Sequence, residues 1–395
     1  MNLTKEQQEI YDGKQGATLA KVMQTLVRYG ELFGADGMVP VTSKYNHLVT
    51  SFGLKALAPV YELMNQLIES GNVSKQNFSA DPRPLDPNVP SSFLQDFVFK
   101  NFMYSKQDDY EKQLTQLGIM EKDAYTCTCY MDEVGNTPAM GEVLSWSESS
   151  AVVYANSVLG ARCNRNSGII DLMGSVVGYV PRFGLLTDEG RKATWIVKIE
   201  TTKKPEAQLL GSAIGMKVMA DVPYIVGLDK WLGGELDDAA KTYLKDFGAA
   251  TASNGAVGLY HVENITPEAV KYGKDLIAED AKVYVVDDAE LQRVYESYPV
   301  IWKKKDAKPK LCFMGCPHMS LQQLIDWTEK VSQSLKEAGR ARVCIPTVFT
   351  AAPAVLKKFQ ETPYAETLKA TGVITSYICP LMLSLIHISE PTRRS

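Results

Sequence analysis

Three short apolar runs near the end of the chain decide the fold: KLCFMGC at residues 310–316, RVCIPTVF at 342–349 and GVITSYIC at 372–379. Segments with helical patterns separate these runs. Apolar runs that alternate with helices predict β-α-β-α-β connections, and such connections form a parallel sheet. Ser320 and Gln323 make a capping-box pattern that predicts the start of the first crossover helix.

The same signals organise the rest of the chain. Thr4 and Gln7 predict another helix start, and apolar residues keep helical spacing up to Gly34. A proline-rich loop is expected at 81–90, and strands at 38–42, 195–200 and 282–286. A chain of 395 residues is long enough for two or three packed subdomains. We expect them at about residues 1–100, 101–305 and 306–382.

Composition and charge exclude several classes of protein. Apolar residues make up 45% of the chain and charged residues 22%, as in a globular protein rather than a disordered or fibrous one. The 42 Lys+Arg and 46 Asp+Glu residues nearly balance, and the longest basic run is Lys303–Lys305. Nucleic acids and anionic membranes are therefore not expected partners. A small molecule is the expected substrate.

The two ends of the chain and the cysteine count indicate the cellular compartment of the protein. Residues 1–6 lack the apolar segment of a secretory signal, and seven dispersed cysteines do not form a disulfide framework. We expect a cytoplasmic protein with reduced thiols and no membrane-spanning segment. Residues 383–395 (LSLIHISEPTRRS) resemble a translated sequencing adapter, so we expect a non-native tail there.

Some of the cysteines are candidate metal ligands. Cys316 and Cys379 close two of the predicted parallel strands, where ligand sites of open α/β sheets lie. A helix beginning after Ser320 would favour a thiolate at Cys316. Burial as small apolar side chains is the alternative for both. With few histidines in the chain, thiolate-bound iron is a better expectation than imidazole-bound zinc.

The segment GEVLSWSESSAVVYANSVLGARCNRNSG, at 141–168, combines many polar groups with small residues. Its two arginines, Arg162 and Arg165, are suited to two-point binding of a carboxylate or phosphate. A polar surface loop is the alternative. Because the chain has no P-loop, no G-x-G-x-x-G before a helix and no G-x-S-x-G, nucleotide chemistry and a serine hydrolase have no support.

Several stretches together resemble the catalytic (large) domain of the aconitase X family. They are TCTCY at 126–130, GEVLSWSESSAVVYANSVLGARCNR at 141–165, HVENITPEA at 261–269 and GCPHMSL at 315–321, and they occur in the family's order after the opening LTKEQQEIYDGKQG. The resemblance implies an α/β fold: an aconitase-like, multi-layer body with parallel-sheet (βαβ) subdomains over residues 1–382. It also implies a hydro-lyase that eliminates water from a β-hydroxy acid.

The resemblance further implies the site, the cofactor and the partner. The cofactor is mononuclear iron or an iron–sulfur cluster ([4Fe-4S] or [2Fe-2S]), with three metal ligands at Cys127, Cys316 and Cys379. A small swivel-domain subunit supplies the catalytic serine. We expect catalytic roles for Glu148, Ser149 and Ser150. Substrate-binding roles are expected for Asn156, Ser157, Arg162, Asn164, Arg165 and His261.

The chain departs from the family pattern at several positions. Cys129 stands for the usual Pro, Cys163 for Thr, Asn166 for Glu, and Tyr377-Ile378 for Asp-Thr. The family substrates are cis-3-hydroxy-L-proline and mevalonate 5-phosphate. Because few cations surround the central motif, we expect the former rather than the phosphorylated acid. A metal-free scaffold or binding subunit is the alternative from another functional class.

Overall fold

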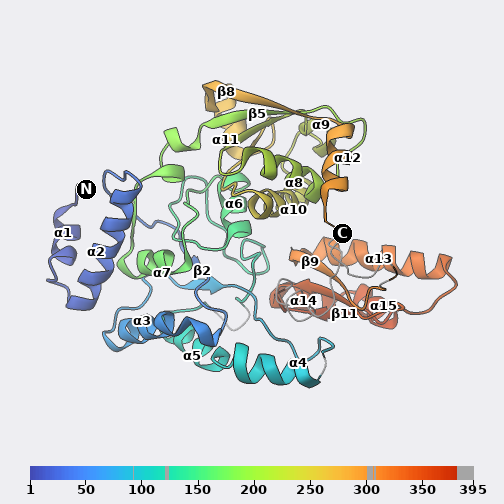
Figure 1. Cartoon of the computed structure of the whole chain (residues 1–395), viewed down its shortest axis with the longest axis horizontal. Coiled ribbons are helices and arrows are strands. Elements are labelled where there is room, and N and C mark those ends of the chain that lie inside the picture. The colour runs from blue at the N-terminus through green and yellow to red at the C-terminus, as the bar shows by residue number, and fades with distance from the viewer. Residues whose placement is uncertain (92, 121–123, 300–305, 307, 380–395) are drawn as a thin grey trace.

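A computed structural model describes residues 1–91, 93–120, 124–299, 306 and 308–379. The predicted tail at 383–395 lies outside them. The chain forms three lobes, and α6 (Ser149–Ser157), which belongs to the first of them, lies near the centre of the molecule (Figure 1). We call them the N-terminal lobe (residues 1–189), the middle lobe (193–297) and the C-terminal lobe (312–379). The architecture is mixed α/β with parallel sheets, as expected.

The N-terminal lobe is mostly helical. The predicted capping box of Thr4 and Gln7 is present. The lobe has one antiparallel pair, β1–β4, and one parallel pair, β2–β3. Its elements are α1 (Lys5–Tyr11), α2 (Ala17–Leu32), β1 (Met38–Pro40), β2 (Asn46–Leu48), α3 (Ala58–Glu69), β3 (Phe78–Ala80), α4 (Phe93–Val98), α5 (Gln107–Leu117), α6, α7 (Gly168–Val177) and β4 (Tyr179–Pro181). One apolar core joins α1, α2, α3 and α5 to α7, so segments on both sides of residue 100 share it.

The middle lobe contains a parallel four-stranded sheet in the order β7-β6-β5-β8. Both strands predicted here are confirmed, as β5 and β8. Helices α8 and α10 share one apolar core with strand residues and α6. Gly211 lets the two helices meet, because a Cβ there would lie 2.4 Å from the Phe247 carbonyl oxygen. The elements are β5 (Ala193–Ile199), α8 (Ala207–Val218), β6 (Pro223–Val226), α9 (Asp229–Leu232), α10 (Asp238–Asn254), β7 (His261–Val262), α11 (Pro267–Tyr272), β8 (Ile277–Val286) and α12 (Asp288–Ser297).

The C-terminal lobe confirms the predicted parallel sheet, with strand order β11-β10-β9. The capping box of Ser320 and Gln323 opens α13, as predicted. The second strand begins at Thr347 rather than at Arg342, since Pro346 has no N–H to donate to a neighbouring strand. The elements are β9 (Cys312–Met319), α13 (Leu321–Glu337), β10 (Thr347–Ala351), α14 (Pro353–Gln360), α15 (Pro363–Ala370) and β11 (Ile374–Ser376).

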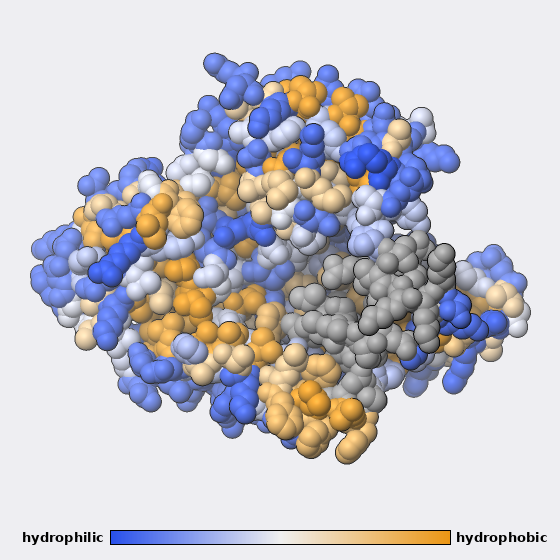
Figure 2. Space-filling model, in the orientation of Figure 1, coloured by the Kyte–Doolittle hydropathy of each residue, from blue (hydrophilic) through white to orange (hydrophobic). Residues whose placement is uncertain are grey.

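Helix α4 and the π-helical turn after it (Phe99–Met103) connect the N-terminal and C-terminal lobes. Phe99 and Tyr104 pack in one apolar cluster with Val348 of β10 and Ile378. The opposite side of the segment is an apolar surface patch, visible at the lower edge of Figure 2. Its exposed side chains are Phe93, Leu94, Phe97, Val98, Phe102 and Met103.

Candidate active site

His318, on β9, joins the segments that carry the three predicted cysteine ligands. Its backbone N–H donates to Cys127 Sγ at 3.4 Å, and its ring Nε2 lies 3.2 Å from the carbonyl oxygen of Ile378, the residue before Cys379. Its carbonyl oxygen accepts from Lys245 Nζ of α10 at 3.2 Å. His318 is fully buried. All three lobes therefore meet at this residue.

Cys316 does not end its strand as we predicted. Strand β9 continues to Met319, and its register shifts between the pairs Met314–Phe349 and Met319–Ala351. Gly315 has a φ of 116°, a conformation that L side chains rarely adopt, and the Cys316-Pro317 peptide is cis. Helix α13 begins at Leu321, after the predicted N-cap Ser320. The irregular stretch leaves Cys316 exposed.

The three cysteines do not form a closed metal site as they are placed. Across the part of the chain that the structure describes, no group of three His, Cys, Asp or Glu side chains could hold a metal ion. Cys379 is half-buried and packs against the apolar cluster of Phe99 and Tyr104. Cys127 is buried, and this burial raises the pKa of its thiol well above the usual value. The three thiols suit iron as a donor set, since iron accepts thiolate ligands.

Glu148 lies beside this cluster, at the start of α6. Its φ of 93° is unusual for a residue other than glycine. One carboxylate oxygen accepts from Ser150 N at 3.0 Å, and the other accepts from Ser150 Oγ at 2.7 Å and Ala151 N at 2.5 Å. Burial raises the pKa of Glu148. Ser149 and Ser150 are half-buried. Glu148 therefore caps α6, and its charge is close enough to Cys127 to raise the pKa of that thiol further.

The two arginines of the central motif differ in their partners. Arg162 pairs with the Asp188 carboxylate and donates to the Leu186 carbonyl oxygen at 3.3 Å. Arg165 is exposed, and its guanidinium donates to the Ala252 carbonyl oxygen at 3.5 Å. Partial burial lowers the pKa of Arg165, and the nearby Glu148 carboxylate raises it. Arg165 is therefore the better placed of the two to bind an anion beside the candidate site.

Four other residues with predicted substrate-binding roles make buried hydrogen bonds within the protein. Asn156 donates to the carbonyl oxygens of Cys163 and Gly258, at 2.8 and 2.9 Å, and its own oxygen accepts from Cys163 N at 2.9 Å. Ser157 Oγ accepts from Tyr260 N at 2.9 Å. The remaining two are Asn164, which bonds Phe183 O and Leu185 N, and His261, which bonds Arg191 O. The polar atoms of these four side chains are thus engaged in contacts within the protein, and their substrate-binding roles stay predictions.

A buried ion pair that the sequence did not indicate lies next to these contacts. Arg191 Nε donates to both carboxylate oxygens of Glu268, at 2.8 and 3.0 Å, and its Nη2 donates to one of them at 2.8 Å. Arg191 also donates to Asn156 Oδ1 at 3.1 Å. The side chains of Arg191 and Glu268 are 1% and 5% exposed. Through Asn156, the pair ties α6 to α11 of the middle lobe.

The burial of His261 predicts a pH-dependent stability. Burial lowers the pKa of His261 from 6.5 to about 4. Between these pKa values the unfolded chain binds more protons than the folded protein. The contribution of His261 to the free energy of unfolding is therefore fully present above pH 6.5 and is lost as the pH falls toward 4. The difference corresponds to about 3 kcal/mol for one histidine. We expect His261→Gln, which retains an N–H donor, to flatten this dependence, as measured by urea unfolding at several pH values.

His318 is a second buried histidine, and burial also lowers its pKa to about 4, so it adds to the loss of stability at low pH. The His261→Gln variant should therefore retain part of the acid dependence. An equal loss of stability on acidification in the wild type and in His261→Gln would contradict the prediction.

A second buried pair, His47 and Asp81, also lies near the cysteines and was not predicted. His47 Nε2 lies 3.5 Å from Asp81 Oδ1. Burial opposes protonation of His47, but the Cys129 sulfur and the Asp81 carboxylate raise its pKa to about 10. Burial raises the pKa of Asp81, whereas His47 lowers it. The sequence does not show that these two residues are in contact, because they are 34 positions apart.

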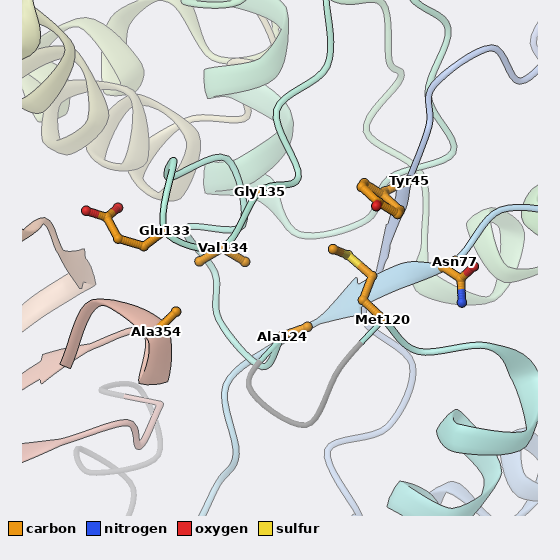
Figure 3. Close-up of a pocket in the computed structure, with 8 residues that line it drawn as sticks. All are labelled: Tyr45, Asn77, Met120, Ala124, Glu133, Val134, Gly135 and Ala354. Carbon is orange, nitrogen blue, oxygen red and sulfur yellow. The ribbon is translucent and has the colours of Figure 1, made fainter. Parts of the chain in front are cut away.

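A surface cavity of about 460 Å³ lies apart from the predicted site residues. Figure 3 shows Glu133 at one end, near α14, and Tyr45 and Asn77 at the other. Glu133 pairs with Lys358 at 3.8 Å. The cavity is lined by Tyr45, Asn77, Met120, Ala124, Glu133, Val134, Gly135 and Ala354.

The three lobes meet at His318, where the segments that carry Cys127, Cys316 and Cys379 converge, and this junction is the candidate catalytic site of a multi-lobed enzyme. The chain belongs to the aconitase X family: the model of the aconitase X first domain matches residues 1–189 and that of the second domain matches 193–296. The resemblance in the sequence motifs is thereby confirmed. No helix among the described residues is long and apolar enough to span a membrane.

Individual relatives agree with the family assignment. The phosphomevalonate dehydratase large subunit of Thermococcus kodakarensis is 32% identical over 93% of this chain and 86% of its own length. The cis-3-hydroxy-L-proline dehydratase of Hypocrea jecorina is 27% identical over 82% of this chain and 52% of its own length. The holo-form crystal structure of Thermococcus kodakaraensis aconitase X has a TM-score of 0.77 and 29% identity, over 96% of this chain and 89% of that one. The chain is a hydro-lyase of this family.

Proposed function

We propose that this chain is the large subunit of a dehydratase that eliminates water from mevalonate 5-phosphate. The observation that carries the proposal is the junction at His318, which gathers three cysteine-bearing segments beside Glu148 and Arg165. The relative from Thermococcus kodakarensis supports this substrate, because it aligns over nearly the whole chain and bears the name of that activity.

The comparisons favour mevalonate 5-phosphate over the cis-3-hydroxy-L-proline that we expected from the sequence. Our expectation depended on a shortage of cations near the central motif, and the names of the relatives outweigh it. Arg83, whose carbonyl oxygen accepts from Cys379 N at 2.9 Å, adds a cation near the candidate site, but its guanidinium is already paired with the Glu111 carboxylate at 2.8 and 3.1 Å. Cis-3-hydroxy-L-proline is the second candidate, because the Hypocrea relative bears that name.

An iron centre and a second subunit complete the proposal. Cys127, Cys316 and Cys379 would hold the iron, since thiolates suit it and each lies on a segment bonded at His318 or next to it in sequence. Bound iron would supply a Lewis acid that polarises the leaving hydroxyl. The small subunit would carry the serine that removes the α-proton, and relatives named "large subunit" support such a partner.

The test is to co-express the chain with a small subunit of this family, purify the complex without oxygen, and offer both acids. We expect loss of water from mevalonate 5-phosphate and no turnover of cis-3-hydroxy-L-proline. The opposite result would change the substrate and leave the lyase assignment intact. An iron-free complex that turns over neither acid would favour a scaffold or binding subunit.

Arg165→Lys should damage turnover much more than folding. An ammonium group cannot reproduce the planar, two-donor contact of a guanidinium with a carboxylate or phosphate. Loss of one such contact costs about 1.5–3 kcal/mol, which corresponds to a decrease of roughly 10- to 150-fold in kcat/KM. The measurement is steady-state kinetics of the complex, with thermal unfolding as the check on folding.

Arg162→Lys is the matched control, because Arg162 lies three residues away and already pairs with Asp188. It should retain kcat/KM within a few-fold of the wild type. Equal kinetics for the two variants would contradict a substrate contact specific to Arg165.

A further inference from the structure

The His47–Asp81 pair joins a fully buried imidazole to a carboxyl group that is slightly exposed. His47 lies on β2, and Asp81 directly follows the parallel strand β3. The His47 side chain is 0% exposed and that of Asp81 is 11% exposed. Asp81 Oδ1, the oxygen nearest His47, is buried, so the exposure of this side chain lies elsewhere on it. Neither His47 Nε2 nor Asp81 Oδ1 makes a well-formed hydrogen bond within the described part of the chain.

Neighbouring residues fix the orientation of the His47 ring. Its Nδ1 lies 2.9 Å from Ser79 Oγ, and Asn136 Nδ2 donates to that same oxygen at 2.9 Å. Because the pKa of His47 is raised to about 10, both ring nitrogens carry a hydrogen near neutral pH, so Nδ1 donates to Ser79 Oγ and Nε2 lies 3.5 Å from Asp81 Oδ1. The Trp146 ring packs edge-on at 5.7 Å between centroids. His47 thus serves as the positioning residue for the Asp81 carboxyl group.

Backbone hydrogen bonds place Asp81 between two of the proposed ligand segments. The Ala80 carbonyl oxygen accepts from Thr126 N at 2.7 Å, next to Cys127. The Arg83 carbonyl oxygen accepts from Cys379 N at 2.9 Å. Residues 80–83 therefore bridge the two cysteine segments, and Asp81 lies in the middle of the bridge.

The elimination needs a proton for the departing oxygen, and the other nearby side chains are less suited to supply it. Both oxygens of Glu148 accept hydrogen bonds from the first turn of α6. Lys245 Nζ donates to Asp246 Oδ1 at 2.6 Å and to the His318 carbonyl oxygen. Asp81 lies between the two cysteine segments, and its side chain retains 11% exposure.

We propose that Asp81, held by His47, is a catalytic acid that protonates the leaving hydroxyl; this inference rests on the proposed dehydratase function. The electron pair of the α-C–H bond becomes the double bond, and its proton goes to the base on the small subunit. The β-C–O bond breaks with both electrons on oxygen. That oxygen takes the Asp81 proton and leaves as water, and the carboxylate regains a proton from solvent.

The surroundings of Asp81 favour the protonated state that this role requires. Burial raises the pKa of Asp81, although His47 opposes the shift. The groups that interact with Asp81 electrostatically include Glu148 of α6, Cys127 and Tyr110 of α5. Negative charge on any of these groups would favour the neutral carboxyl further.

The test compares Asp81→Asn, Asp81→Ala and the wild type in the iron-loaded complex. Loss of a general acid lowers kcat by roughly 10²- to 10⁴-fold. We expect that loss in both variants, with KM within a few-fold and unchanged iron content. Formate, a small carboxylic acid that fits the space of the missing side chain, should partly restore Asp81→Ala and not Asp81→Asn.

Asp171→Asn is the matched control, because Asp171 is another buried carboxyl group whose pKa burial raises. It should keep wild-type kcat. Near-normal kcat in Asp81→Asn, loss of iron from it, or absence of formate rescue would each overturn the proposal. A wild-type complex that dehydrates neither acid would refute the proposed function itself, which these variants do not test.

Discussion

Glu268→Gln should destabilise the protein by about 3–5 kcal/mol, because it leaves the buried Arg191 guanidinium without its counter-charge. Glu268 receives three close contacts from Arg191, whose side chain is only 1% exposed. Burial lowers the pKa of Arg191 and the Glu268 carboxylate offsets this only in part, which shows how costly the isolated charge is. Equilibrium urea denaturation of the two proteins measures the difference.

The control is another two-point contact between an arginine and a carboxylate, placed at the surface. Arg182 donates through Nε and Nη2 to the Asp36 carboxylate, and both side chains are about half exposed. Water and salt screen such a pair, so Asp36→Asn should leave the unfolding midpoint nearly unchanged. Similar unfolding midpoints for Glu268→Gln and the wild type would show that the Arg191 charge is solvated in another way.

Local signals explain why much of the C-terminal lobe could be predicted. The capping box of Ser320 and Gln323 depends only on residues within one turn, and it starts α13 where expected. Apolar runs separated by helical patterns likewise predicted that the three strands are parallel, as they are in the structure. The position of Cys316 was not predictable in this way, because the register shift arises between β9 and the distant β10.

The roles of polar residues in the central motif could not be predicted from residue type. Asn156 and Ser157 suit substrate binding as well as they suit buried structural contacts. What decides between these roles is the distant partners, Arg191 and Tyr260, which the fold brings to them. The sequence likewise does not distinguish Arg162 from Arg165. Only the fold shows that Arg162 is paired with Asp188.

The contact between His47 and Asp81 could not be predicted from the sequence either. They come together through the parallel pair β2–β3, in which each strand has three residues. Strands this short carry little periodic signal. Asp81 also lies in a proline-rich loop, where a carboxyl group is usually solvated. Such a pair is recognised only from the contacts in the folded structure.

Cys316→Ser should abolish iron binding while the fold stays intact. A hydroxyl group is a poor ligand for a metal that prefers thiolates, although serine is nearly isosteric with cysteine. Cys316 is exposed, so few packing contacts depend on its sulfur. The measurements are iron content after preparation without oxygen and the thermal unfolding midpoint of the same samples.

Cys312→Ser and Cys344→Ser are the controls, because both residues lie in the C-terminal part of the chain and neither is a proposed ligand. Cys312 is half-buried at the start of β9, and Cys344 is exposed in the loop before β10. Both variants should bind as much iron as the wild type. If all three variants keep the same iron content, Cys316 is not a ligand, and the convergence at His318 then serves packing of the three lobes rather than metal binding.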